Sequence, residues 1–404
     1  MATFRNNSIV TLETMPGSDA KELKLIFSYC KIKYLLTGLL ENAINTRYLD
    51  LSHNEIEREQ LSADVFKGPY NNTAYAPIAL EELDLSYNRI HSLQKNLFIH
   101  TPNLKSLNLE GNSLRVIDHL SCLALAKATK MQFFNLARNK LTEVPGDAIK
   151  HFKNLTEINL SFNELDFVPE SLGYVAQSLQ IVNVSNNPIV EFEHNTFEGF
   201  EHVIKLYANN LNKLLSVRAR IFTPLKRLQI LELSHCELLR EIDEEAFAHL
   251  QKLKEVYLND NNLRTISPLL LPWNQIEIVD IRRNQFMCNC DLYNISQQLP
   301  NFLKSGVNSP YCVDPVNYCS VEIVMLTNET CSYNNKMGPR GQIQALGNFR
   351  VMKITLVTLI IVLVISSVLA VWLGYVKWRV YQRNLLYPFP SEIVYSPVTT
   401  GYKC

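Results

Sequence analysis

The stretch "LEELDLSYNRIHSL", residues 80 to 93, spaces its apolar residues in a way that fits neither an amphipathic helix nor a long strand. A helix repeats apolar residues every three and four positions and a half-buried strand alternates them, whereas only Leu83 and Leu85 alternate here. The pattern predicts one turn of a coil, in which a short strand buries one face and Asn88 closes a corner. A single coil of this kind cannot bury its apolar face alone, so copies are expected to stack.

The same pattern recurs through most of the chain. Apolar residues lie five and three positions before a corner residue and two positions after it in eleven copies, with corners at Cys30, Asn54, Asn88, Asn112, Asn139, Asn163, Asn187, Asn209, Cys236, Asn261 and Asn284. The corners recur at similar intervals, and one longer step, from Asn54 to Asn88, holds an insertion around "KGPYNNTAYAP". Phe4, Asn7 and Ile9 fit the tail of a twelfth copy.

The recurring unit resembles the leucine-rich repeat, L-x-x-L-x-L-x-x-N/C-x-L. A further apolar position in "NLFIHTPNL", "AIKHFKNL", "NTFEGFEHV" and "EAFAHLQKL" resembles the roughly 24-residue class of extracellular members. The resemblance implies an α/β solenoid over residues 1–286, a leucine-rich repeat horseshoe with a parallel concave sheet. Eleven strands about 4.8 Å apart would make that sheet roughly 50 Å long. We expect Cys30 and Cys236 to fill corners as buried, unreactive thiols.

Five of the nine cysteines follow the last repeat, within residues 287–332. Four of them resemble the cysteine-rich C-terminal cap of extracellular leucine-rich repeat proteins, and a cap is needed because the last coil would otherwise expose its core to water. The resemblance implies disulfides between Cys288 and Cys312 and between Cys290 and Cys331, whereas counting alone allows three pairings.

The fifth cysteine of this cluster, Cys319, is left over. A free thiol, an alternative partner for a neighbour and an intermolecular link are all open for it. A zinc site is the competing interpretation of the whole cluster, and it is disfavoured because no histidine lies among the cysteines.

The segment 354–376, "ITLVTLIIVLVISSVLAVWLGYV", contains no charged side chain. At 1.5 Å rise it would form about 35 Å of helix, enough to cross a hydrocarbon core of about 30 Å. N-glycosylation sequons all precede this predicted transmembrane helix, at Asn6, Asn71, Asn154, Asn159, Asn183, Asn294 and Asn328. The cap's disulfides also require an oxidising compartment. We therefore expect a single-pass plasma-membrane protein with an extracellular N-terminal region, a juxtamembrane linker at 333–353 and a cytoplasmic tail at 377–404.

The first residues, "MATFRNNSIVTLETM", lack the apolar core of a signal sequence. Two explanations are open: the chain is truncated, or the apolar span itself serves as a signal anchor.

Composition and motifs exclude several classes of function. Lys plus Arg equals Asp plus Glu at 39 each, and no polybasic stretch argues for nucleic acid. Nucleophile elbows, zinc-protease motifs and glycine-rich phosphate loops are lacking, so neither an enzyme nor a cofactor or metal is predicted.

The concave sheet is the expected binding surface, for an extracellular protein ligand or co-receptor. Four positions before each corner, the outward residues are Asp50, Asp84, Asn108, Asn135, Asn159, Asn183, Lys205, Glu232, Tyr257 and Asp280. The run of asparagines fits a solvated ladder as well as a binding stripe, and glycans on Asn159 and Asn183 would crowd the middle of the sheet. Aromatic and cationic groups are favoured at hot spots, so the candidate ligand-binding residues are Lys205, Tyr207, Tyr257 and Arg282.

The resemblance implies a cell-surface receptor or adhesion molecule that recognises a protein. An innate immune or signalling co-receptor, or a noncatalytic subunit stabilising a secreted enzyme, are the alternatives. In the tail, Tyr395 and Val398 of "YSPV" resemble the signal read by clathrin adaptors, which predicts a clathrin adaptor as a cytosolic partner.

Overall fold

The computed structural model describes residues 1–299, 310–314, 319–328, 372–375 and 377–379. The chain divides into two units, residues 1–332 and 333–404. In the part of the chain that the structure describes, no helix is both long and apolar enough to cross a membrane. The candidate span at 354–376 lies almost entirely outside the described residues, and the linker at 333–353 and the tail motif of Tyr395 and Val398 lie wholly outside them.

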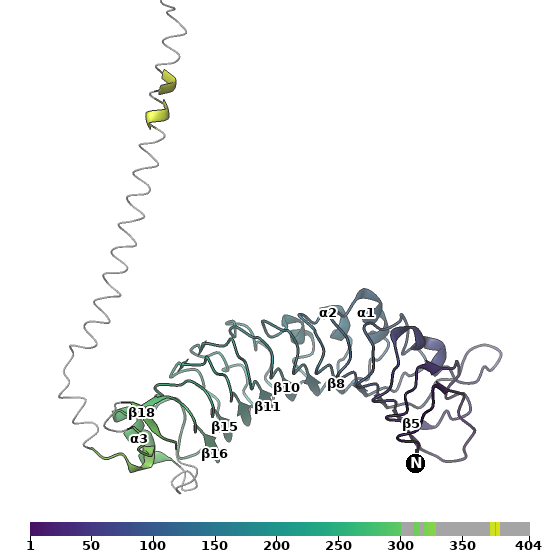
Figure 1. Cartoon of the computed structure of the whole chain (residues 1–404), viewed down its shortest axis with the longest axis horizontal. Coiled ribbons are helices and arrows are strands. Elements are labelled where there is room, and N and C mark those ends of the chain that lie inside the picture. The colour runs from purple at the N-terminus through teal and green to yellow at the C-terminus, as the bar shows by residue number, and fades with distance from the viewer. Residues whose placement is uncertain (300–309, 315–318, 329–371, 376, 380–404) are drawn as a thin grey trace, which may run out of the picture. The chain divides into compact units, whose positions relative to one another are not determined.

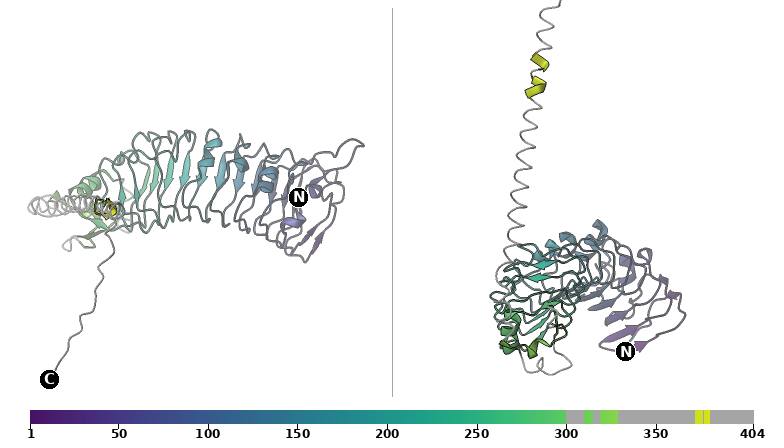
Figure 2. Two further views of the ribbon diagram at one scale, coloured as in Figure 1. Left: turned by 90° about the horizontal axis from the view of Figure 1, so that it is seen from above. Right: turned by 60° about the vertical axis from the view of Figure 1, so that its left-hand side comes forward.

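Unit 1–332 is built on one twelve-stranded parallel sheet, as predicted. Its strands follow each other in sequence order: β1 (Ala2–Thr3), β3 (Leu23–Ile26), β5 (Thr46–Asp50), β6 (Glu82–Asp84), β7 (Ser106–Asn108), β8 (Phe133–Asn135), β9 (Glu157–Asn159), β10 (Ile181–Asn183), β11 (Lys205–Tyr207), β13 (Ile230–Glu232), β15 (Glu255–Tyr257) and β16 (Ile278–Asp280). They lie side by side along the inner side of the solenoid (Figures 1 and 2). Each coil therefore contributes one short strand.

The remaining elements lie away from this sheet. The helices α1 (His119–Leu125) and α2 (Gly146–Ile149) lie on the outer side of the coils (Figure 1). The others are β2 (Thr11–Leu12), β4 (Tyr34–Leu35), β12 (Ser216–Val217), β14 (Glu241–Ile242), and the 3₁₀ turns η1 (Arg58–Gln60), η2 (Ala63–Phe66) and η3 (Glu170–Tyr174). Short coils with little helix leave the inner sheet as the largest regular surface.

Each strand forms because two side chains of its coil are buried. The middle residue of the strand and the residue two positions later both point into one continuous core. Leu83 and Leu85 are 1% and 0% exposed, and the leucines of all the coils join one apolar cluster. Burial of this kind contributes about 1.5–3 kcal/mol for each large apolar side chain. No coil has a core of its own, so the stack folds as a unit.

The corner asparagines satisfy backbone groups of two neighbouring coils. Asn112 Nδ2 donates to the carbonyl oxygens of Leu109 (3.1 Å) in its own coil and Leu85 (2.9 Å) in the preceding one. Asn112 Oδ1 accepts from the backbone N–H of Ile90 at 3.0 Å. Asn112 is 8% exposed, so these groups would otherwise be buried without partners. Asn7 Nδ2 donates in the same way to the Phe4 oxygen, at 2.9 Å, which places the start of the chain in a further coil.

Cysteine takes over the corner in two coils, as predicted. Cys236 Sγ contacts the backbone oxygens of Ala208 and Ser234 at 3.7 and 3.6 Å, the bonds an asparagine amide would make. Burial raises the pKa of the Cys236 thiol to about 12, so it stays protonated at neutral pH. Cys30 is likewise buried and free. Both are structural thiols.

One corner was predicted wrongly. The pairing of β11 aligns Leu206 with Val182 on one side and with Leu231 on the other, which puts Leu211, not Asn209, at the corner. Leu211 is 0% exposed. With Leu211 the steps to the preceding and following corners are nearly equal, whereas Asn209 makes the first step short and the second long. The sequence misled because Asn209 and its apolar neighbours satisfy the same short pattern two positions early.

The cap closes the C-terminal end of the stack. A disulfide joins Cys288, which follows β17 (Phe286–Met287), to Cys312 at the start of β18 (Cys312–Asp314), with Cα atoms 5.5 Å apart. The cap also contains α3 (Cys290–Gln298) and the 3₁₀ turn η7 (Ile323–Met325). This bond confirms the first predicted pair and removes two thiolates from any zinc site.

The second predicted pair is described only in part. Cys290 is also disulfide-bonded, but its predicted partner, Cys331, lies outside the described residues. Cys319 is a free, exposed thiol.

Candidate functional site

Two rows of outward side chains run across strands β9 to β16 of the concave sheet. The first row is Glu157, Ile181, Lys205, Ile230, Glu255 and Ile278, and the second row is Asn159, Asn183, Tyr207, Glu232, Tyr257 and Asp280. The strand residue between the two rows is buried in every case. The rows are therefore what a partner approaching this half of the sheet would meet.

The corrected register changes the candidate binding residues. Tyr207, not Lys205, lies in the second row, where Glu232 separates it from Tyr257. Lys205 lies in the first row between Ile181 and Ile230. Lys205 and Tyr207 thus lie on the same strand, β11, and Tyr257 lies on β15, with β13 between the two strands.

The two tyrosines are half-buried phenols with acidic side chains nearby. Tyr257 Oη donates to Glu255 Oε2 at 3.0 Å. Burial, together with this hydrogen bond, raises the pKa of Tyr257 to about 12. Burial also raises the pKa of Tyr207, and the nearby Glu232 carboxylate acts in the same direction. Both rings therefore remain neutral at neutral pH and offer an apolar face with a polar tip.

Arg282 was predicted as a cationic contact, and the structure places it in an intramolecular ion pair. Its Nε and Nη2 donate to the two carboxylate oxygens of Asp280, at 2.9 and 2.6 Å. This fork also raises the pKa of Arg282. Its charge is largely compensated within the chain, so Arg282 contributes less positive potential than an unpaired arginine would.

The charge of the surface is consequently acidic rather than cationic. The two rows and Arg282 together carry the carboxylates of Glu157, Glu232, Glu255 and Asp280 against the two cations Lys205 and Arg282. Three isoleucines of the first row add apolar surface, and Ile278 is 36% exposed. Sequence reasoning named Glu232 and Asp280 as outward residues but missed the isoleucines and acids of the first row, although alternation two positions before the second row would have found them.

A second set of side chains that sequence reasoning missed lies one position before each corner. In successive coils the residue at this position has a positive φ, as in Tyr29 (58°), His53 (53°) and Tyr87 (53°). The His53 ring stacks between the two tyrosines, with centroids 4.1 and 4.4 Å away. Gly111 continues this row, and a Cβ there would lie 2.6 Å from the Tyr87 ring. An alignment of the repeats would have shown these residues, because they share the position directly before the corner. The repeat pattern allows any residue at that position.

The predicted glycosylation sites differ in exposure. Asn159 and Asn183 are half-buried and directly paired on β9 and β10. Ser161 Oγ donates to Asn159 Oδ1 at 2.8 Å. The other five sequons have exposed asparagines: Asn6, Asn71, Asn154, Asn294 and Asn328.

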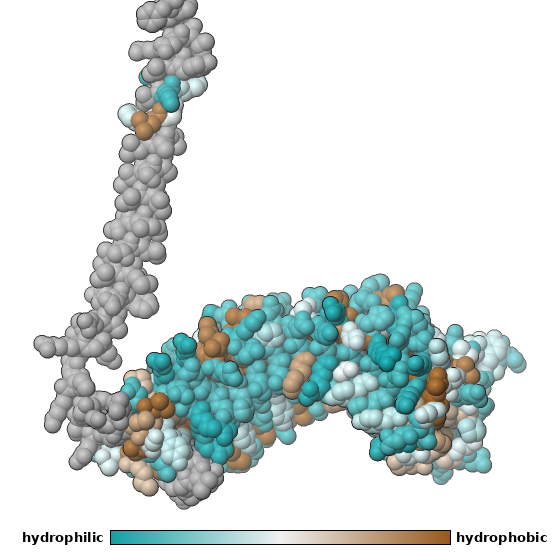
Figure 3. Space-filling model, in the orientation of Figure 1, coloured by the Kyte–Doolittle hydropathy of each residue, from teal (hydrophilic) through white to brown (hydrophobic). Residues whose placement is uncertain are grey.

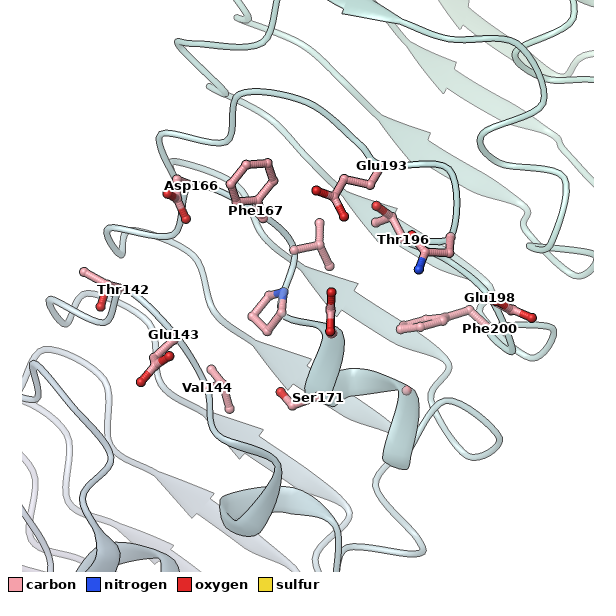
Figure 4. A pocket seen from close by; sticks show the side chains of 15 residues that line it. Thr142, Glu143, Val144, Asp166, Phe167, Ser171, Glu193, Thr196, Glu198 and Phe200 are labelled. Atoms are coloured by element: carbon pink, nitrogen blue, oxygen red, sulfur yellow. The ribbon is translucent and has the colours of Figure 1, made fainter. Parts of the chain in front are cut away.

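A pocket of about 640 Å³ opens among the loops of three successive coils (Figure 4). Carboxylates dominate its lining, with Glu143, Asp166, Glu170, Glu193 and Glu198 beside Phe167 and Phe200. The lining contains no histidine, cysteine, lysine or arginine. Across the described residues, no three histidine, cysteine or acidic side chains are grouped to hold a metal ion.

Two segments match family models described as leucine rich repeat, one model at residues 78–127 and another at residues 154–175. The chain is 26% identical to Tsukushi of Gallus gallus over 60% of its length and 69% of that protein. It is 29% identical to CD180 antigen of Mus musculus over 69% of its length, but spans only 38% of that relative.

Solved structures share the fold. A chain of the Drosophila Toll–Spatzle complex matches 81% of this chain with a TM-score of 0.56 and 19% identity, and 48% of that chain is covered. A chain of the mouse RP105/MD-1 complex matches 78%, also with a TM-score of 0.56 and 19% identity, and 57% of it is covered. With the repeated corner, the parallel sheet and these matches, the chain is a member of the leucine-rich repeat family.

Proposed function

We propose that this chain is an exported, membrane-anchored receptor or adhesion molecule that binds a protein through the C-terminal half of its concave sheet. The observation that carries the proposal is the surface around Tyr207 and Tyr257, where aromatic and isoleucine side chains lie among acids. Tyrosines of this kind are favoured anchors at protein interfaces. The surrounding carboxylates favour a ligand with apolar side chains and an excess of lysine or arginine.

Three features support export and anchoring. The Cys288–Cys312 disulfide is typical of oxidising compartments. The seven sequons precede the apolar segment 354–376, which would serve as the anchor. The likeness to chains of the Toll–Spatzle and RP105/MD-1 complexes, in which the same fold is assembled with another protein, supports a role in protein recognition.

A co-receptor for a soluble ligand is the second candidate function. It is supported by the likeness to chains of the Toll–Spatzle and RP105/MD-1 complexes, in each of which the fold is assembled with another protein. An adhesion molecule would hold its ligand on another cell, whereas a co-receptor would capture a soluble one.

Binding by cells that express the full chain tests the proposal. Cell aggregation would indicate adhesion, and capture of soluble proteins alone would indicate a co-receptor. Replacing Tyr207 and Tyr257 by serine should weaken either activity at least about tenfold, because buried aromatic anchors dominate interface energies. Tyr174→Ser is the matched control, since Tyr174 is a 60% exposed tyrosine in η3, off the sheet. Binding that survives the double change but fails in the control would place the site elsewhere.

A further inference from the structure

We propose that the pocket of Figure 4 binds a basic segment of a partner protein, in which arginine or lysine side chains alternate with apolar ones. The pocket opens among the loops of three successive coils, and none of its lining residues belongs to a strand of the twelve-stranded sheet. The inference therefore assigns a second interaction surface, separate from the one around Tyr207 and Tyr257.

The base of the pocket is apolar. Val144, Val168 and Phe200 line it although each is at most 7% exposed, so they form its floor. Phe167 is 41% exposed and adds an aromatic ring to the wall. At about 640 Å³ the pocket falls within the range of roughly 300–1,000 Å³ that is usual for ligand sites. It has room for apolar side chains of a partner.

Exposed carboxylates line the same pocket: Glu143, Asp166, Glu170, Glu193 and Glu198. Among the described residues, none of these five acids forms an ion pair. Acids just outside the pocket do pair with the following coil. Glu191 binds Arg218 at 2.5 Å, and Glu201 binds Lys226 at 2.6 Å. The lining offers no such cation, so the negative charge of the pocket is left for a partner to compensate.

A single metal ion does not account for these acids. In the part of the chain that the structure describes, no three histidine, cysteine or acidic side chains are grouped to hold one. The five carboxylates come instead from three loops and lie around the pocket (Figure 4). Charge spread in this way suits several cationic groups that are carried on one chain.

A shielded hydroxyl is an independent sign of a missing partner. Ser171, in η3, lines the pocket, and its Oγ is shielded from solvent. Within the described residues this oxygen has no hydrogen-bond partner. A shielded polar group without a partner is unfavourable, and a peptide backbone offers a carbonyl or an N–H at almost every residue. A bound segment of protein chain could supply what Ser171 lacks, whereas a simple cation could not.

Arginine fits this combination of groups better than any other side chain. Its stem is apolar, its guanidinium donates to carboxylates in a fork, and the same group stacks on aromatic rings. The chain already uses this stacking elsewhere, since the Arg138 guanidinium carbon lies 3.9 Å from the centroid of the Phe162 ring. In the pocket, Phe167 offers a ring and the surrounding acids offer the carboxylates.

The test measures the affinity of the full chain for a short labelled peptide in which arginine and leucine alternate. The pocket variant combines Glu143→Gln, Asp166→Asn and Glu193→Gln, which removes three charges and keeps the side-chain shapes. At about 0.15 M salt, charges more than about 8 Å apart are largely screened, so the local carboxylates decide the result. We expect the affinity to fall about tenfold or more.

A matched control removes the same number of charges away from the pocket. It combines Glu13→Gln, Asp19→Asn and Glu241→Gln, which replace exposed acids that lie off the twelve-stranded sheet. This variant should bind the peptide within about twofold of the unchanged protein. A peptide with glutamate in place of arginine should bind neither protein measurably.

A photoreactive group on the leucines locates the bound peptide. Crosslinks are expected in residues 142–144, 166–173 and 193–200. Replacing Tyr207 and Tyr257 by serine should leave peptide binding unchanged, which separates this pocket from the proposed sheet surface. Equal affinities of the pocket and control variants, crosslinks to the sheet alone, or calcium that displaces the peptide would each overturn the inference. None of these results would contradict the proposed function.

Discussion

At the scale of single residues, the corner determines how one coil bonds to the next. An asparagine amide there joins donors and acceptors that the coil cannot satisfy itself, as Asn187 does with the backbone oxygens of Leu160 (3.0 Å) and Val184 (2.9 Å). Leu211 fills the same place by packing alone, and Cys236 by weak thiol contacts. The solenoid therefore tolerates different chemistry at its corners, even at two consecutive ones, Leu211 and Cys236.

The difference between Asn187 and Asn209 gives the first prediction. Asn187→Ala should lower the free energy of unfolding by about 2–4 kcal/mol, because it leaves several buried backbone groups without partners. Asn209→Ala should change it by less than about 1 kcal/mol, since Asn209 is half-buried and its Nδ2 donates to the Glu232 side chain. Thermal unfolding of the two variants measures both values. Equal losses would mean that Asn209 is a corner residue after all.

Tyr257 gives a pH-dependent prediction. Its pKa of about 12, against an ordinary value of 10.0, means that folding favours the neutral phenol. Above pH 10 the unfolded chain binds fewer protons at this group, so its contribution to stability falls as pH rises toward 12. Tyr257→Phe should therefore leave the tyrosinate absorbance at pH 10 nearly unchanged. If the substitution instead removes the absorbance of half a tyrosinate at pH 10, the Tyr257 phenol titrates at its ordinary pKa of 10.0.

At the scale of elements, the ends of the solenoid differ from its middle. Inner strands pair on both sides, whereas the last coil has a partner on one side only and needs the cap. β17 and β18 supply that cover, and their parallel pairing is held by the disulfide beside it. In the view of Figure 3 the surface of the coils is mostly hydrophilic, with apolar residues gathered near the cap and the N-terminal coils.

The cap gives the third prediction. Cys288→Ser should destabilise the chain by about 2–5 kcal/mol and reduce its export, because the disulfide holds β18 against the last coil. Cys319→Ser should have little effect, since Cys319 is free and exposed. Unfolding temperatures and the amount of chain at the cell surface measure the two effects. Comparable damage from both changes would argue for a different bonding pattern in the cap.

At the scale of the whole molecule, the predicted topology separates a recognition surface from a short tail. Seven sequons and a disulfide-bonded cap precede the apolar segment, and no sequon follows it.

Topology gives the fourth prediction. In intact cells, residues before Lys353 should be accessible to added protease and should carry glycans that a glycosidase removes, while an epitope added after Val376 should be protected. Alkaline extraction should leave the full chain in the membrane fraction. Protection of the repeats from protease, with an accessible C-terminal epitope, would reverse the proposed orientation.

The sequence by itself determined the solenoid, most corners and the place of the cap. These features follow from local spacing, because each coil repeats the same short-range requirement for an apolar strand and a corner that satisfies the backbone. The candidate site was predicted only in part: Tyr207, Tyr257, Glu232 and Asp280 were named, but the isoleucines and acids of the first row were not. Alternation within each strand could have named those residues, but which of them lie beside the tyrosines depends on how separate coils pair.

Only the tertiary structure decided three further points. Asn209 and Leu211 both fit a corner locally, and the register with β10 and β13 chose Leu211. Arg282 looked like a cationic contact until its geometry paired it with Asp280. The Tyr29, His53 and Tyr87 rings stack because their coils stack in register. In each case the deciding contact joins residues whose relation depends on how one coil lies against another or on how a side chain turns, and a one-dimensional pattern contains neither.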